Sequence, residues 1–238
     1  MNKLYQLLKA NASPARNQMR VANDADATTI YLYDVIDADW GINAQDFARA
    51  LAAVQDGPIN LRVNSPGGDV FEARAIAAAI QQHKGKVTAF VDGLAASAAT
   101  TIVTAADEVV IADGSFFMIH NAWSLAIGNK NDLRETASLL EKIDGAIAAD
   151  YSARTGKASD EIAVMMDAET WLTAQEAVDM KFADRLAEKA KAQNEMKRWN
   201  VAAFEHPPTA LTVDSGDAER IATQRARNER RLRLLEID

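Results

Sequence analysis

The chain has no cysteine, which excludes disulfides, thiol nucleophiles and thiolate metal sites together. It also has no run of eighteen apolar residues, and a transmembrane helix requires such a run. Its first residues lack the long apolar core and the cleavage site of a signal peptide. From these absences we expect a cytoplasmic protein without a membrane partner.

Basic residues are the minority among the charged ones. Lysine and arginine number 26 and aspartate and glutamate number 34, which gives a net charge of −8. Because nucleic-acid binding needs a high density of basic residues, we do not expect nucleic acid as a partner. The sequence contains neither a cluster of metal ligands nor a nucleotide-binding motif, so we expect no metal and no cofactor. If the chemistry needs a histidine base, only His83, His120 and His206 are available.

A length of 238 residues suits one α/β domain with extensions. Residues Thr28–Tyr33 and Ile59–Val63 have the β-branched and aromatic content of strands. Between them, Asn43 is a predicted helix N-cap, with Asp46 three residues later. A strand, a helix and a second strand with a crossover of this length predict a βαβ unit with parallel strands.

The organisation of the chain changes at both ends. We predict an N-terminal arm (residues 1–27, partly helical), a domain (28–186) and a C-terminal extension (187–238, partly helical or disordered). Within the domain, Asn129 and Asp132 are predicted to cap a long helix that ends at Gly156. Its apolar stripe fits a subunit interface, although packing against the core would explain the stripe equally well.

A run of small residues, Val91–Thr100, follows a β-rich stretch. We predict a strand, a tight turn, and then the start of a buried helix, with Ser97 at or just inside the turn; Gly93 allows the backbone a conformation closed to other residues. A hydroxyl in that position lies beside free N–H groups, where an oxyanion could be held. Taken alone, this segment is explained as well by a small serine at a crowded packing site.

Two further turns carry polar groups. Gly67 and Gly68 follow a strand and precede a predicted helix, and adjacent glycines can aim an uncovered N–H at a ligand. His120 ends the predicted strand Phe116–Ile119, at the edge where α/β sheets place their ligands. An ordinary βα turn and a core histidine are the respective structural alternatives.

A third stretch supplies carboxylates. Asp167–Leu172 is predicted to be extended, and Thr173 with Glu176 forms a capping box for the helix that follows. Nucleophilic acyl transfer needs a hydroxyl, a base, an acid that orients the base, and donors for the oxyanion. Ser97 and His120 are suited to be the first pair.

At these residues the sequence resembles the ClpP family, the proteolytic subunits of Clp protease. The resemblance spans residues 28–186 and rests on four motifs in the family's order: Leu61–Gly68, Gly93–Ala98, Phe117–His120 and Glu169–Ala174. The Asp-Ala-Glu-Thr-Trp form, a short Asp-Trp-Gly insert and the unrelated tail are most similar to the ClpP-related head maturation proteases of tailed phages.

The resemblance implies an α/β fold, the ClpP/crotonase-like superfold of stacked βαβ units, with the helix at 131–155 projecting as a handle. It implies Ser97 as the nucleophile and His120 as the general base and acid. The backbone N–H groups of Gly68 and Ala98 would form the oxyanion hole; many ClpP proteins have methionine at the position of Ala98.

The residue at the position of the orienting acid departs from the family pattern. The usual aspartate position matches Glu169, which is one methylene longer. Asp167 lies two residues earlier and, on an extended strand, would face the same side. Motif register favours Glu169, and Asp167 is the alternative.

The implied function is a serine endopeptidase, ATP-independent or fed by a partner, and most specifically a phage prohead (capsid maturation) protease. Its expected substrates are peptides or proteins, including capsid or scaffold proteins, and it would work as a homo-oligomeric ring or as stacked rings in the host cytoplasm or the assembling prohead. The alternatives are a catalytically inactive capsid assembly or scaffolding component, a general ClpP-type degradation subunit, and a hydrolase of small acyl substrates.

Overall fold

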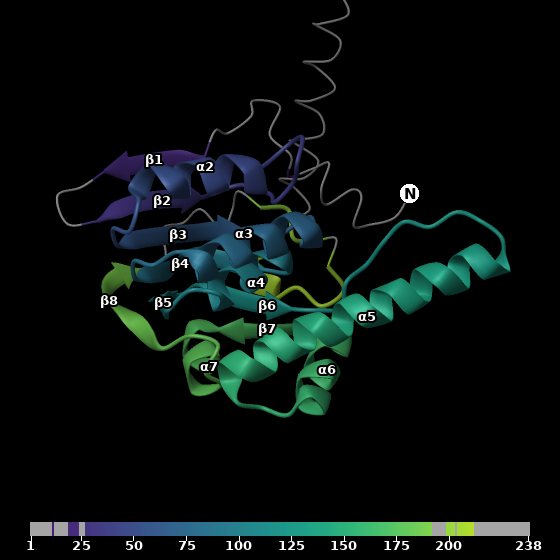
Figure 1. The fold of residues 1–238 in the computed structure, drawn as a ribbon. Coiled ribbons are helices and arrows are strands. Elements are labelled where there is room, and N and C mark those ends of the chain that lie inside the picture. The colour runs from purple at the N-terminus through teal and green to yellow at the C-terminus, as the bar shows by residue number, and fades with distance from the viewer. Residues whose placement is uncertain (1–10, 12–18, 24–26, 192–198, 203, 212–238) are drawn as a thin grey trace, which may run out of the picture.

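The computed structural model describes residue 11 and residues 19–23, 27–191, 199–202 and 204–211. They form a mixed sheet of eight strands with helices packed on it (Figure 1). The strands are β1 (Arg20–Asn23), β2 (Thr28–Leu32), β3 (Ile59–Ser65), β4 (Val87–Ala96), β5 (Glu108–Asp113), β6 (Phe116–Ile119), β7 (Thr170–Thr173) and β8 (Arg185–Lys191). The helices are α2 (Ala44–Val54), α3 (Val70–Gln82), α4 (Ala98–Thr104), α5 (Lys130–Thr155), α6 (Ser159–Asp167) and α7 (Ala174–Asp179), and Thr209–Leu211 forms a short 3₁₀ turn, η2.

The main sheet has the order β1-β2-β3-β4-β5-β8. Its strands from β2 to β8 run parallel, and only β1 is antiparallel to its neighbour. The parallel unit β2-α2-β3 is therefore confirmed, as is the α/β fold class. Asn43 caps α2 by accepting the N–H of Asp46, as the sequence predicts.

Strand β4 pairs with different strands along its length, and this positions its carboxyl end, where Ser97 follows. Its first half lies between β3 and β5, whereas Leu94–Ala96 pair with β6 instead. Strand β6 pairs in turn with β7. The carboxyl ends of β4 and β6 consequently lie side by side, and the segments that follow them leave the sheet together.

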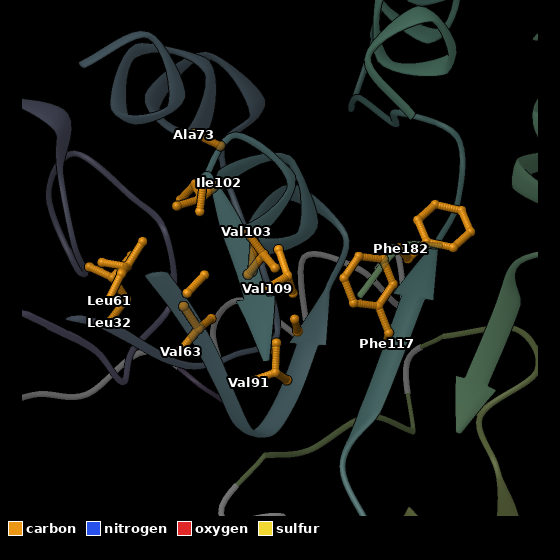
Figure 2. Packing of buried hydrophobic residues seen from close by; sticks show 14 of the residues in the cluster. Leu32, Leu61, Val63, Ala73, Val91, Ile102, Val103, Val109, Phe117 and Phe182 are labelled. Atoms are coloured by element: carbon orange, nitrogen blue, oxygen red, sulfur yellow. The ribbon is translucent and has the colours of Figure 1, made fainter. Parts of the chain in front are cut away.

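The core is built from the inward-facing residues of the parallel strands. Leu61, Val63 and Val91 are fully buried under α3 and α4, where they meet Ile102 and Val103 (Figure 2). Burying a side chain of this size contributes about 1.5–3 kcal/mol. Near β6, the rings of Phe117 and Phe182 pack with their centroids 5.3 Å apart (Figure 2). The strands that carry the site are thus held rigidly.

Helix α5 projects from the body as a handle (Figure 1). The predicted capping box of Asn129 and Asp132 is present, and Gly156 ends the helix in the left-handed conformation. Ile147 and Tyr151 are buried in the core, so core packing accounts for this part of the apolar stripe. Among the described helices, none is long and apolar enough to cross a membrane.

Of two local predictions, one is confirmed and one is wrong. The turn is at Ser97, as predicted, and β4 stays extended through Gly93 as far as Ala96 because β6 provides a pairing partner. Asp167–Leu172, however, is not one extended piece. Asp167 is the last residue of α6, and Glu169 has a positive φ of 47° before β7 begins.

The outer segments also contribute to the fold. Residues 20–23 of the predicted N-terminal arm add strand β1 to the sheet, and β8 continues beyond the predicted domain end at 186. Residues 199–202 and 204–211 pack against the body through buried Trp199, Val201, Phe204 and Leu211. The remainder of the predicted C-terminal extension, from residue 212 onward, lies outside the described residues.

Candidate active site

Ser97 occupies the junction between β4 and α4. It is the N-cap residue of α4 and has φ 55° and ψ −130°, a conformation that strains any residue with a side chain. Its N–H donates to the Met118 carbonyl of β6 at 2.9 Å, and its carbonyl accepts the Thr100 N–H at 2.9 Å. Its hydroxyl makes no capping bond. The backbone is therefore fixed on both sides, while the hydroxyl is not used to cap the helix.

His120 follows the last residue of β6, and its Nε2 lies 2.7 Å from the Ser97 Oγ. The pairing of Leu94–Ala96 with Phe116–Met118 brings these residues together although 23 positions separate them. The loop after His120 is tied to α5, because the Ala122 N–H donates to the Asp144 carboxylate at 2.7 Å. This arrangement lets the imidazole accept the hydroxyl proton.

The surroundings of His120 keep its imidazole neutral. Burial lowers its pKa to about 4, and the negative charge of Glu169 opposes that shift only in part. A neutral imidazole is the form that can remove a proton from a hydroxyl.

The pH dependence of a Ser97-dependent reaction should report this pKa. The reactive form is neutral His120, which predominates above its pKa, so the rate should stay on its plateau from pH 7 down to about pH 5. Below about pH 4 it should fall roughly tenfold for each pH unit. The measurement is the rate of covalent labelling by a serine-directed probe between about pH 3.5 and 8, with circular dichroism at each pH to show that the fold persists. A midpoint near the ordinary histidine value, about 6.5, would contradict this description of the site.

The two candidate acids lie in different environments. Glu169 is buried, with 7% of its surface exposed, and its charge acts on His120. Asp167, at the end of α6, accepts a hydrogen bond from the Asn121 side-chain amide at 2.7 Å. Of the two carboxylates, Glu169 is the one with a direct electrostatic effect on the imidazole.

The hydrogen bonds of Glu169 come from other groups. Its Oε1 accepts from the Trp171 Nε1 at 3.1 Å and from the His206 N–H at 2.7 Å, and its Oε2 accepts from the Glu205 N–H at 2.7 Å. Among the described residues, no hydrogen bond joins Glu169 to His120. In this structure Glu169 thus acts on His120 through its charge.

The glycine turn lies against the serine. Gly67 has φ 89°, and a Cβ built on it would be 2.8 Å from the Ser97 Cβ and 2.9 Å from the Ala98 nitrogen. Gly68 has φ 151°, and a Cβ there would be 2.0 Å from the Ile36 carbonyl oxygen. Ala98 begins α4, where a backbone N–H has no partner inside the helix. Gly68 and Ala98 line the same cavity as the Ser97–His120 pair.

That cavity has a volume of about 330 Å³ and is open to solvent on one side. One wall is the apolar face of α5, and the remainder comes from the glycine turn with the start of α3, from the start of α4, from the loop after His120 and from Asp37. Tyr151 lies at the base, where burial raises its pKa to about 12 and its hydroxyl meets the Thr100 hydroxyl at 2.5 Å. The α5 residues that line the cavity are Thr136, Leu139, Leu140, Ile143, Ile147 and Tyr151.

Comparisons with known proteins identify the family of the chain. The family model described as Clp protease matches residues 18–190. The chain belongs to the Clp protease family. It is 31% identical over 158 residues to the "ATP-dependent Clp protease proteolytic subunit 3" of Rhizobium meliloti, which covers 66% of this chain and 81% of that protein.

Other relatives and a solved structure extend the comparison. The chain is 30% identical over 154 residues to the "ATP-dependent Clp protease proteolytic subunit 1" of Leifsonia xyli subsp. xyli, covering 62% of this chain and 78% of the relative. The structure of a point mutant of ClpP1 from Listeria monocytogenes matches with a TM-score of 0.61 at 22% identity. This match covers 78% of this chain and 95% of that one. It supports the Clp protease fold.

Sequence reasoning missed one part of the site. Residues 199–211 lie beyond the region matched by the Clp protease family model, yet the Phe204 ring packs edge-on against His120 with 5.6 Å between centroids. The backbone of Glu205 and His206 binds Glu169. The only local signal was the presence of Trp199, Val201 and Phe204 in an otherwise polar region.

Proposed function

We propose that this member of the Clp protease family is a serine endopeptidase with Ser97 as its nucleophile and His120 as its general base and acid. The observation that carries the proposal is the 2.7 Å contact between the Ser97 Oγ and the His120 Nε2 at the edge of a solvent-accessible cavity. Glu169 stabilises the imidazolium through its charge. The N–H groups of Gly68 and Ala98 are the proposed oxyanion donors.

The reaction follows from these groups. Ser97 Oγ attacks the scissile carbonyl carbon while its proton passes to His120 Nε2, and the carbonyl oxygen becomes an oxyanion held by the two N–H groups. The imidazolium then gives the proton to the leaving amine, and the peptide C–N bond breaks to leave an acyl-enzyme. Water, deprotonated by His120, attacks the acyl carbon and releases the acid product and Ser97.

Two departures from the family motifs are compatible with catalysis. Replacing methionine by alanine at position 98 changes the side chain and leaves the backbone donor in place. A glutamate at 169 carries the same charge as an aspartate and reaches one methylene further. Because Ser97 and His120 are in contact, activity is a better account of the site than an inactive assembly component.

The test is hydrolysis by the purified, full-length protein. Wild type should cleave unstructured polypeptides such as casein, or fluorogenic peptides, and Ser97→Ala should lose at least about 10⁴-fold in kcat. The variant should retain the wild-type oligomer and melting temperature, because Ser97 makes no side-chain capping bond. Equal hydrolysis by wild type and Ser97→Ala would show that Ser97 is not the nucleophile.

We further propose that the protein forms a homo-oligomer and that the exposed first half of α5 contributes to the contact between subunits. Leu133 and Leu139 on α5 are 46% and 52% exposed, unlike Ile147 and Tyr151 further along the same helix. Leu133→Asp should therefore lower the assembled mass in sedimentation velocity and leave the protomer folded. Glu135→Asp on the same exposed stretch of helix is the matched control and should assemble normally. Unchanged assembly of Leu133→Asp would place the contact elsewhere.

The narrower proposal is cleavage of capsid or scaffold proteins in an assembling phage head. Its support is the Asp-Ala-Glu-Thr-Trp motif together with a C-terminal part that continues beyond the matched family region and packs on the site. The purified enzyme should then process a phage prohead without ATP or an ATPase. Hydrolysis that needs an ATPase and leaves proheads intact would favour the alternative, a general degradation subunit.

A further inference from the structure

The last described part of the chain folds back onto the strands that carry the site. We call residues 199–202 and 204–211 the C-terminal clasp; it is the yellow-green segment of Figure 1. Its apolar side chains form a buried cluster with residues of β4, β6 and the segment after β2. The clasp side chains in this cluster are Trp199, Val201, Phe204 and Leu211, and the body contributes Val35, Leu94, Ala96 and Met118.

The beginning of the clasp is anchored away from the site. The Trp199 Nε1 donates to the Asn64 side-chain oxygen on β3 at 3.0 Å, and the Trp199 side chain is 2% exposed. Asn200 exchanges two hydrogen bonds with the Asn11 side chain, at 2.9 and 2.6 Å. These contacts fix the direction in which the clasp enters the site.

The middle of the clasp holds the Glu169 carboxylate. Consecutive backbone N–H groups, from Glu205 and His206, donate to the two different oxygens of Glu169, both at 2.7 Å. Hydrogen bonds to a charged group are stronger than those between neutral groups, and a buried carboxylate that loses them is strongly disfavoured. Glu169 also has a strained backbone, with φ 47°. Its position therefore depends on the clasp.

The same part of the clasp covers the imidazole. The Phe204 ring meets His120 edge-on, with 5.6 Å between centroids, and Trp171 edge-on as well, with 5.4 Å. Phe204 is 3% exposed. A buried ring in this position shields the imidazole from water.

We propose that the C-terminal clasp is a positioning element of the active site, which fixes the Glu169 carboxylate and shields His120, so that full activity requires a docked clasp. This inference rests on the proposed roles of His120 and Glu169. With the clasp docked, the Ser97 Oγ and the His120 Nε2 are in contact at 2.7 Å, so docking is compatible with a reactive pair.

The N–H of residue 206 can be removed selectively. Residue 206 precedes Pro207, and a residue before proline favours an extended backbone. Proline itself is compatible with an extended backbone, so it can replace His206. We expect kcat for peptide hydrolysis by His206→Pro to be about tenfold below that of His206→Ala, since only the proline variant lacks the donor to Glu169. In a Glu169→Ala background, which lacks the acceptor of that N–H, the difference between the two variants should largely disappear. Ala202→Pro, which removes an exposed N–H bonded to Asn200, is the matched control for a proline in this segment.

The shielding of His120 by Phe204 is tested by a measurement that does not require peptidase activity. The ionisable groups near His120 are Glu169, Glu205 and His206 toward the clasp, Asp144 and Asp167, which bind the loop after His120, and Asp37 and Asp69 in the cavity lining; of these, Glu169 acts on its pKa. Burial is the larger influence on that pKa. Phe204→Ala should therefore raise the His120 pKa from about 4 toward the ordinary value of about 6.5, whereas Phe204→Leu should keep it low. NMR titration of the three histidines, assigned by single replacements, gives the value.

The outcomes separate the two proposals. If wild type hydrolyses peptides but His206→Pro matches His206→Ala, or exceeds it, the clasp does not position Glu169 and the peptidase assignment stands. If wild type is inactive, the peptidase assignment fails and the titration still decides the shield. A His120 pKa that is the same in wild type and in a folded Phe204→Ala variant overturns the shielding role.

Discussion

Replacing His120 with alanine is expected to lower kcat for peptide hydrolysis by about 10⁴- to 10⁶-fold, because Ser97 then has no base to take its proton. The effect should be on kcat more than on KM, since the wall formed by α5 remains intact. The measurement is steady-state hydrolysis of a fluorogenic peptide.

The matched control is His83→Ala. His83 is the other described histidine with a ring hydrogen bond, at 2.8 Å to the Gly57 carbonyl, and it lies beyond the end of α3 outside the Ser97 cavity. Its loss should leave kcat within about twofold and cost about 1 kcal/mol of stability. If both variants lost activity equally while remaining folded, the special role of His120 would be wrong.

Gly67→Ala is expected to produce the second large effect. At φ 89° the new Cβ would lie 2.5 Å from the Ala96 carbonyl oxygen and 2.8 Å from the Ser97 Cβ. Either the glycine turn or the Ser97 junction must move, and the proposed oxyanion donors move with it. Loss of one such donor costs about 10²- to 10³-fold in kcat, so we expect a loss of at least that size together with a lower melting temperature.

Gly145→Ala is the matched glycine control. Gly145 lies inside α5, and a Cβ there meets nothing within 4 Å. The substitution should stabilise the protein by up to about 1 kcal/mol through helix propensity and leave hydrolysis unchanged. A Gly67→Ala variant as active as Gly145→Ala would show that the turn has room that this structure does not provide.

Local sequence signals predicted much of the fold. The capping boxes at Asn129 and Thr173 are present, because each depends on side chains only three residues apart. The parallel β2-α2-β3 unit was predictable from alternating strand and helix patterns. Contact between Ser97 and His120 follows once both are placed at the carboxyl ends of strands.

Non-local contacts explain the features that the sequence did not predict. Extension of β4 through Gly93 depends on pairing with β6, which lies further along the chain and cannot be read from a run of small residues. Asp167 remains helical because Ile162 and Met166 continue the buried face of α6. The clasp binds Glu169 from 36 residues away, and its apolar residues follow no helix or strand period.

The measurement that tests the account most directly is labelling with a fluorophosphonate probe, with the adduct located by peptide mapping. Size-exclusion chromatography should first show that wild type, Ser97→Ala and His120→Ala form the same oligomer. We expect one adduct per chain in wild type, on Ser97, and none in either variant. A correctly assembled wild type that remains unlabelled, or an adduct on another residue, would contradict the Ser97–His120 mechanism and favour a structural role for the fold.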